Sequence, residues 1–177
     1  MRSARLFPLV LTGLFAALIL TATAYLPRIP TANGYVHIGD ALIYLAASVL
    51  PLPQAAVAAG MGGFLADVLT GYGHWAPFTL IIKACLTLSF TAVKPTLWCG
   101  RNIFAAIAAF PITVGGYYAA AWLMTGSALA PLAEVPANAL QAGASLVIYL
   151  TLANRLDKAG FKAYLSHLTG SPPNRRL

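Results

Sequence analysis

The sequence predicts an all-α integral membrane protein, folded as one domain that contains a bundle of six transmembrane helices. Of its 177 residues, 59% are hydrophobic and 8% are charged, whereas soluble domains carry about 25% charged residues. Apolar segments close to the roughly 20 residues that a spanning helix needs recur along the chain, separated by prolines and glycines. The first of them, 6–26, is longer than the apolar core of a signal peptide, which is about 7–15 residues. We therefore expect it to be the first span.

Prolines and glycines set the limits of the expected spans. Pro27 ends the first, Pro51 ends the second and Gly71 ends the third. Pro77 lies in the first turn of the fourth, where a helix tolerates proline, and Pro111 predicts a kink in the fifth. The six spans are expected at 6–26, 37–50, 54–70, 77–93, 103–124 and 137–153, and a basic tail follows at 154–177.

Two further patterns concern helix packing. The third span has small residues three or four positions apart, which favours close approach of neighbouring helices; they are Ala55, Ala59, Gly62, Gly63 and Ala66. In the tail, four apolar residues fall on one helical face: Phe161, Tyr164, Leu165 and Leu168. This spacing predicts a short helix that lies on the membrane surface.

The basic residues predict that both termini are cytoplasmic. Six spans place both ends on one side, and positive residues concentrate on the cytoplasmic side of a membrane. Nine of the 11 lysines and arginines fall on the side of the termini: Arg2, Arg5, Lys94, Arg101, Arg155, Lys158, Lys162, Arg175 and Arg176. Arg28 falls on the other side, and Lys83 lies within a span.

With this orientation, the polar residues of the spans gather in the outer half of the bundle. At 1.5 Å per residue, Asp40, Asp67 and Lys83 lie about 5, 6 and 9 Å below the outer surface. The outer turns of the sixth span place Asn138 and Gln141 on one face, and Tyr117, Tyr118 and Trp122 reach the same level on the fifth. The pattern predicts a cup that opens to the outside, with an apolar inner half.

The cup suits a flat heterocyclic ligand. Rings that could stack on it are Tyr35, Tyr72, Trp75 and Trp122, and hydrogen-bonding groups are Asn33, His37, His74, Asn138 and Gln141. An intramembrane charge costs about 2.5–3.5 kcal/mol on insertion scales, so Asp40, Asp67 and Lys83 must be paired or functional. One alternative is a purely structural ion network, for example a pair between Asp67 and Lys83. Asp40 or Asp67 could meet a cationic or NH-rich ring, and Lys83 could meet a hydroxyl or an anion. If an aspartate neutralises Lys83, a neutral substrate is favoured.

The motifs of several enzyme classes are absent from the sequence. It contains no G-x-x-x-x-G-K-[ST] phosphate loop, no G-x-S-x-G and no H-E-x-x-H. Cys85 and Cys99 are expected to be free thiols, and no His, Cys, Asp or Glu pair has the spacing of metal ligands. We therefore expect no enzyme activity, no metal and no cofactor. The net charge of +7 resides at the chain ends and in one loop, so nucleic acid is not an expected partner.

Three motifs between positions 34 and 83 carry a family resemblance. They are GY-x-x-x-GD (Gly34, Tyr35, Gly39, Asp40), GG-x-x-AD-x-x-x-GY (Gly62, Gly63, Ala66, Asp67, Gly71, Tyr72) and AP-x-x-x-x-x-K (Ala76, Pro77, Lys83). In these motifs and in its six-span plan, the chain resembles the S components of energy-coupling-factor (ECF) vitamin transporters. The riboflavin-type and hydroxymethylpyrimidine-type group is the most similar.

The resemblance implies a function and a set of partners. Such a subunit captures a water-soluble vitamin or precursor from outside, here a thiamin precursor such as hydroxymethylpyrimidine, a B6 vitamer or a riboflavin-like compound. It docks on a scaffold subunit with two cytoplasmic ATPases, and toppling of the bundle moves the substrate. Gly13 and Ala17 match the family's A-x-x-x-A docking motif. The implied location is the plasma membrane of a bacterium.

Two other functions remain open at this point. A structural or assembly membrane protein would have no outward cup, and its polar residues would all serve helix packing. A self-sufficient permease would show inverted repeats and polar groups across the whole membrane thickness.

Overall fold

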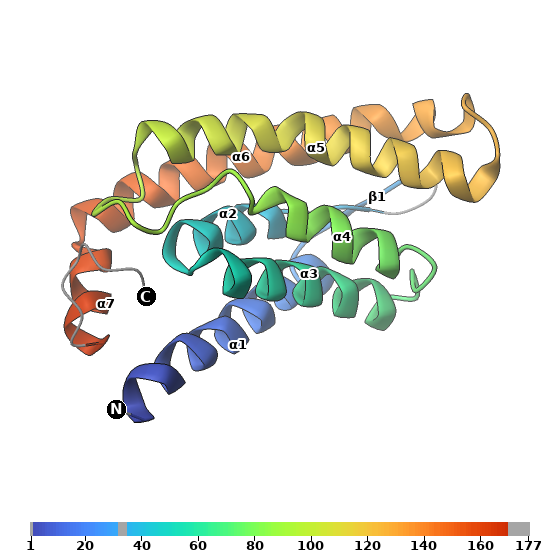
Figure 1. The fold of residues 1–177 in the computed structure, drawn as a ribbon. Helices are drawn as coiled ribbons and strands as arrows, with labels where there is room; N and C mark the ends of the chain where they lie inside the picture. Colours follow the sequence, from blue (N-terminus) through green and yellow to red (C-terminus); the bar gives the residue numbers. More distant parts are fainter. Residues whose placement is uncertain (1, 32–34, 170–177) are drawn as a thin grey trace.

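The computed structural model describes residues 2–31 and 35–169, which form a helical bundle with one small β-hairpin (Figure 1). The helices are α1 (Arg2–Ala24), α2 (Gly39–Val49), α3 (Leu52–Leu69), α4 (Ala76–Leu86), α5 (Gly100–Thr125), α6 (Val135–Lys158) and α7 (Phe161–Thr169), with a 3₁₀ helix, η1 (Ala130–Glu134), before α6. The strands β1 (Ile29–Pro30) and β2 (Tyr35–Val36) pair antiparallel, with Ile29 opposite Val36. The hairpin was not predicted from the sequence.

Each expected span contains a helix, but only some of these helices are long enough to cross a membrane. Within the described residues, four segments have the length and hydropathy of a span: Phe7–Ala24, Leu52–Leu69, Gly100–Thr125 and Ala130–Lys158. The helices α2 and α4 have 11 residues each, which is about 16 Å of helix against a hydrocarbon core of about 30 Å. Six complete crossings therefore remain a prediction.

The largest error in the expected boundaries concerns the fourth span, which was predicted to run from 77 to 93. The helix α4 ends at Leu86, and an irregular connection leads to α5. The side chain of Asn102 holds this connection away from helical geometry, because it accepts the N–H of Thr91 at 2.8 Å and donates to the C=O of Thr91 at 3.1 Å. The helix α5, in contrast, continues through Pro111.

The connection is also held from α6 and α7, at the end of the bundle away from the hairpin (Figure 1). The two carboxylate oxygens of Asp157 accept the backbone N–H groups of Leu97 and Trp98 at 2.8 and 2.7 Å. The ammonium group of Lys162 donates to the C=O groups of Ala92 and Lys94 at 2.9 and 2.7 Å. We call Asn102, Asp157 and Lys162 the basal cluster.

The helix α7 forms where the sequence predicts it, and part of its apolar face contacts the core. Leu165 is 7% exposed, and Phe161 packs against the core. Phe161 and Leu165 therefore pack on the protein itself, and a position of α7 on the membrane surface stays a prediction. Tyr164, which was assigned to the same face, is 61% exposed, and the side chain of Leu168 lies outside the described part.

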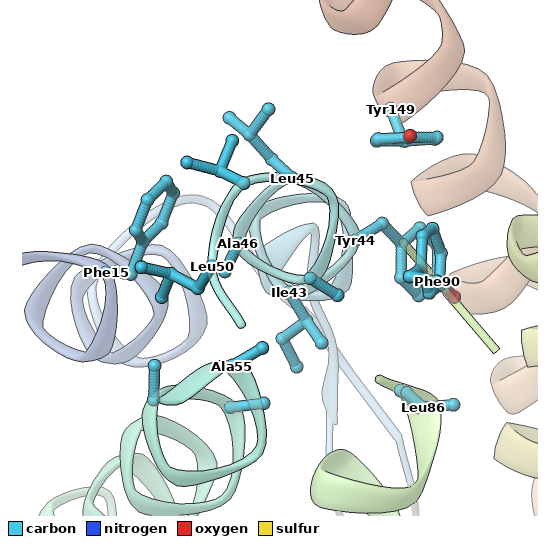
Figure 2. Close-up of a cluster of buried hydrophobic side chains, with 14 of the residues drawn as sticks. Phe15, Ile43, Tyr44, Leu45, Ala46, Leu50, Ala55, Leu86, Phe90 and Tyr149 are labelled. Carbon is cyan, nitrogen blue, oxygen red and sulfur yellow. The ribbon is translucent and has the colours of Figure 1, made fainter. Parts of the chain in front are cut away.

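The core surrounds α2, which is the most deeply buried helix. Ten of its 11 residues are buried, as expected for a helix that is apolar on all sides. Figure 2 shows Tyr44 of α2 next to Phe90 of the connection and Tyr149 of α6. The ring centres of Tyr44 and Phe90 are 5.4 Å apart and stacked, and Tyr149 meets Phe90 edge-on at 5.8 Å. These rings attach α2 to the long helix α6.

The small residues of α3 allow α1 and α4 to approach closely, as predicted. A Cβ atom on Gly62 would lie 2.9 Å from the carbonyl oxygen of Ala16, and one on Gly63 would lie 2.9 Å from the side chain of Thr79. Such distances are shorter than ordinary contacts, so larger residues would force the helices apart. The packing brings the end of α3 and the start of α4 together at the hairpin end of the bundle.

Candidate functional site

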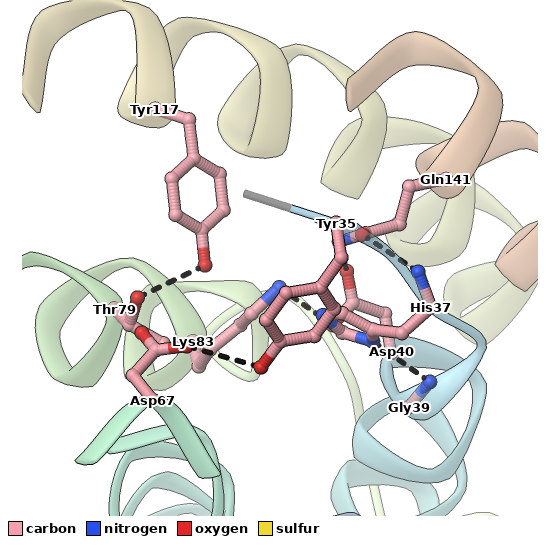
Figure 3. Close-up of polar contacts among 9 residues, drawn as sticks. All are labelled: Tyr35, His37, Gly39, Asp40, Asp67, Thr79, Lys83, Tyr117 and Gln141. Carbon is pink, nitrogen blue, oxygen red and sulfur yellow. Dashed lines mark hydrogen bonds and ion pairs between the residues drawn. The ribbon is translucent and has the colours of Figure 1, made fainter. Parts of the chain in front are cut away.

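A buried ion pair lies near the middle of the candidate site. The Nζ atom of Lys83 on α4 is 2.6 Å from Oδ1 of Asp40 on α2, and the two side chains are 1% and 0% exposed (Figure 3). The amide nitrogen of Gln141 on α6 donates to Oδ2 of the same aspartate at 3.1 Å. The network joins three helices, and it shows that the suggested pair between Asp67 and Lys83 is wrong.

His37 extends this network toward the hairpin. Its backbone N–H donates to Oε1 of Gln141 at 3.2 Å, and its Nδ1 atom accepts the N–H of Gly39 at 3.0 Å. A ring nitrogen that accepts a hydrogen bond carries no proton, so the imidazole is neutral with its hydrogen on Nε2. Burial lowers the pKa of His37 to about 4, against the opposing influence of the Asp40 carboxylate.

A pocket opens above this network, between the hairpin and the ends of α3, α4, α5 and α6. It contains about 540 Å³ of empty space, including the part open to solvent. Seven of the residues proposed from the sequence line it: Tyr35, His37, Asp67, Tyr72, Trp75, Asn138 and Gln141.

Two polar atoms in the wall of the pocket have no hydrogen-bond partner among the described residues. Oδ1 of Asp67 accepts a long hydrogen bond, 3.4 Å, from the hydroxyl of Tyr35 (Figure 3), but Oδ2 is buried with no hydrogen-bond partner. Oγ1 of Thr31 is in the same situation. Burial raises the pKa of Tyr35, so its hydroxyl stays protonated and can donate. Because buried polar groups are nearly always hydrogen-bonded, these two atoms at a pocket are candidate contacts for a ligand.

Aromatic rings form the other walls. The ring centres of Tyr35 and Tyr72 are 5.2 Å apart, and those of Trp75 and Tyr117 are 5.9 Å apart in an edge-on arrangement. The hydroxyls of Tyr117 and Thr79 are 3.2 Å apart (Figure 3), which fixes the Tyr117 ring against α4. The pocket therefore combines flat apolar surfaces with a few oriented polar groups.

The other residues proposed from the sequence do not line this pocket. Asp40 and Lys83 are occupied with each other, and His74 lines a neighbouring hollow that shares Trp75 with the pocket. Trp122 is 50% exposed. Asn33 lies outside the described residues.

The sequence analysis missed six lining residues: Thr31, Val36, Thr79, Tyr117, Glu134 and Ala137. Tyr117 was placed at the right level, but Trp122 was selected for stacking in its place. Five positions on a helix separate two side chains by about 140°, so the two residues cannot face the same pocket. The rotation of α5 about its axis, relative to α4, decides which of these side chains faces the pocket. The sequence alone does not give that rotation.

The proposed docking residues lie on the open surface of α1. Both Gly13 and Ala17 are exposed, and a Cβ atom on Gly13 would meet nothing within 4 Å. Leu14 and Leu18 flank them and are 53% and 43% exposed. Within the part of the chain that the structure describes, this face of α1 is therefore exposed and does not pack on other elements.

Comparisons with known proteins agree with this architecture. A protein of Pyrococcus woesei described as "Uncharacterized protein in gap 3'region" is 33% identical over 132 residues, covering 72% of this chain and 87% of that protein. The sequence profile of the family described as "ECF-type riboflavin transporter, S component" matches residues 6–158. This family consists of substrate-binding subunits of transporters and not of enzymes, in agreement with the sequence analysis. The chain is therefore a membrane protein that belongs to the family of ECF transporter S components.

Proposed function

We propose that this chain is the substrate-capture subunit of an ECF importer and that the pocket beneath the hairpin holds the substrate. The observation that carries the proposal is the buried, unpartnered Oδ2 atom of Asp67 in a pocket walled by aromatic rings. A pocket of this kind suits a small heterocycle, because the rings provide stacking surface and the polar atoms fix orientation.

The proposal includes an orientation in the plasma membrane. The chain would cross it six times, with both termini in the cytoplasm and the pocket toward the outside. In the structure, the hairpin, whose residues Tyr35 and Val36 line the pocket, and the start of α1 lie at opposite ends of the bundle (Figure 1). The positive residues concentrate at the end away from the pocket, which supports this orientation.

Riboflavin is one candidate substrate, because the matching family carries that name. A thiamin precursor such as hydroxymethylpyrimidine and a B6 vitamer are further candidates, since each is a flat heterocycle with polar substituents. A structural protein without a substrate would leave the unpartnered atoms of Asp67 and Thr31 unexplained.

The partners in this proposal are a membrane scaffold subunit and two cytoplasmic ATPases. The exposed face of α1 with Gly13 and Ala17 supports docking there, because small residues let another helix approach closely. Replacing both residues with leucine should abolish copurification with the scaffold while leaving substrate binding intact. Loss of binding by the isolated subunit would contradict this assignment.

The direct test of capture is mass spectrometry of small molecules released from the purified, detergent-solubilised chain. Titration with each candidate should then quench or shift the fluorescence of Trp75 at submicromolar concentration. A Trp75→Phe variant should lose most of this signal, and a Trp98→Phe variant, at the other end of the bundle, should retain it. A protein that is purified empty and ignores all candidates would contradict capture and favour the assembly protein.

A further inference from the structure

We propose that the pocket selects a heterocycle that carries a positive charge or a protonated amino group, with the carboxylate of Asp67 as its partner. The inference rests on the proposed function and specifies the chemical class of its substrate. Three features of the pocket support it: the charges on its wall, the unused hydrogen-bond acceptors and the aromatic rings.

The charges on the wall are acidic. Among the described lining residues, Asp67 and Glu134 carry carboxylates and none is a lysine or an arginine. Lys83 is neutralised by Asp40 at 2.6 Å, which by itself favours a neutral substrate, and the carboxylates of the wall add a preference for a cation. Arg28 is exposed and contacts the Tyr35 ring from 4.9 Å, but it does not line the pocket. Two carboxylates in a partly enclosed site attract a cation and repel an anion.

Two hydrogen-bond acceptors in the wall of the pocket are unused. Oδ2 of Asp67 and Oγ1 of Thr31 have no hydrogen-bond partner within the described ranges 2–31 and 35–169, and Asp67 is only 8% exposed. The side chain of Gln141 is occupied at both ends, because it donates to Asp40 and accepts the N–H of His37. A ligand with N–H groups would fill these vacant positions, and a charged donor would gain the most from a buried carboxylate.

The aromatic rings favour the same class of ligand. Tyr35, Tyr72, Trp75 and Tyr117 line the same pocket as Asp67. Ring faces attract cations within about 6 Å of the ring centre, and the attraction is greatest where water is excluded. Tyr117 already has such a contact on another side, since Nζ of Lys83 is 5.1 Å from its ring centre.

The test compares ligands that differ mainly in charge. Pyridoxamine and pyridoxine differ in one substituent, a protonated aminomethyl group against a hydroxymethyl group. Three further ligands extend the comparison. Thiamine carries a permanent positive charge, riboflavin is neutral, and pyridoxal 5′-phosphate is an anion. Binding of all five to the purified chain would be measured by tryptophan fluorescence at pH 7.5 and constant salt. We expect pyridoxamine to bind at least tenfold more tightly than pyridoxine, and the phosphate to bind weakest.

The Asp67→Asn variant keeps the shape of the side chain and removes its charge. It should reduce the ratio of pyridoxamine to pyridoxine affinity to near one, whereas the matched Asp157→Asn variant, in the basal cluster, should leave the ratio unchanged. Tighter binding of pyridoxine or riboflavin than of either cation would overturn the charge preference, even if Asp67→Asn does not fold. Failure of all five ligands to bind a protein that is purified empty would contradict capture itself.

Discussion

The two ends of the bundle use the same residue types in different ways. In the basal cluster, both oxygens of Asp157 accept backbone N–H groups, and Lys162 donates to two backbone carbonyls. At the pocket end, Asp67 accepts one long hydrogen bond from a tyrosine and leaves one oxygen without a partner. An acid whose acceptors are filled by backbone groups stabilises the chain it holds. An acid with a vacant acceptor at a pocket is available to a ligand.

The Asp40–Lys83 pair lies beneath the pocket, and breaking it should have the largest effect on stability. Asp40→Ala leaves an unpaired ammonium group in a site that is 1% exposed, which costs about 3–5 kcal/mol. Thermal unfolding in detergent, followed by circular dichroism, should show a large fall in the midpoint or no folded protein. The double variant Asp40→Asn/Lys83→Met should recover much of the lost stability. If its stability loss equals the sum of the losses in the two single variants, the pairing is contradicted.

The stability of the pocket end should depend on pH through His37. Its pKa is about 4 in the folded chain and about 6.5 when unfolded. The unfolded chain therefore binds more protons between these values, and stability present above pH 6.5 is lost as the pH falls toward 4. The loss amounts to roughly 3 kcal/mol. Asp40 and Lys83 face this ring with opposite effects on its pKa, and burial dominates.

The variant His37→Asn provides the control for this pH dependence. An asparagine oxygen can accept the N–H two residues ahead, as Nδ1 of His37 does at Gly39, but it does not titrate. Unfolding midpoints of both proteins measured from pH 7.5 to 4.5 should diverge on the acid side. Parallel curves would show that His37 is not the group responsible.

The same substitution at the two ends should separate their roles most clearly. In Asp157→Asn one backbone N–H, of Leu97 or Trp98, loses its charged acceptor, which costs about 1.5–3 kcal/mol. The midpoint of thermal unfolding of this variant should therefore fall. The fraction of the protein that remains folded should bind the ligand with unchanged affinity. A stable Asp157→Asn variant with altered ligand binding would reverse the distinction between the two ends.

Asp67→Asn should have the smallest effect on stability. It weakens only one hydrogen bond of 3.4 Å and removes a buried charge whose second oxygen has no partner. The change in unfolding free energy should therefore stay within about 1 kcal/mol, while the affinity for cationic ligands falls. A large loss of stability would show that Asp67 serves the fold more than the ligand.

The features that the sequence predicted best are those set by local chemistry. Prolines and glycines located the helix ends near Pro27, Pro51, Gly71 and Pro77, and the position of charges along each helix placed seven lining residues at one level. The end of α4 was missed because it depends on Asn102, which binds the backbone of Thr91 from another helix. Such a contact leaves no periodic pattern in the sequence.

The choice of ion partner for Lys83 was missed for a related reason. Asp40 and Asp67 have similar estimated depths, so depth could not choose between them. The rotation of α2 and α3 about their axes decides which carboxylate reaches the amine, and that rotation follows from side-chain packing across the bundle. Small residues on α3, such as Ala55, Ala59 and Gly62, predicted that neighbouring helices approach closely. They did not predict how each helix is rotated about its own axis.

The shortness of α2 and α4 also constrains biogenesis. Each helix has 11 residues and carries one partner of the buried ion pair, whose separate transfer into a bilayer costs about 2.5–3.5 kcal/mol per charge. Neither helix is therefore a favourable insertion unit by itself. The two charges compensate each other only after α3 has brought the helices together, so in the proposed six-span arrangement we expect the segment from Gly39 to Leu86 to enter the membrane as one cooperative unit.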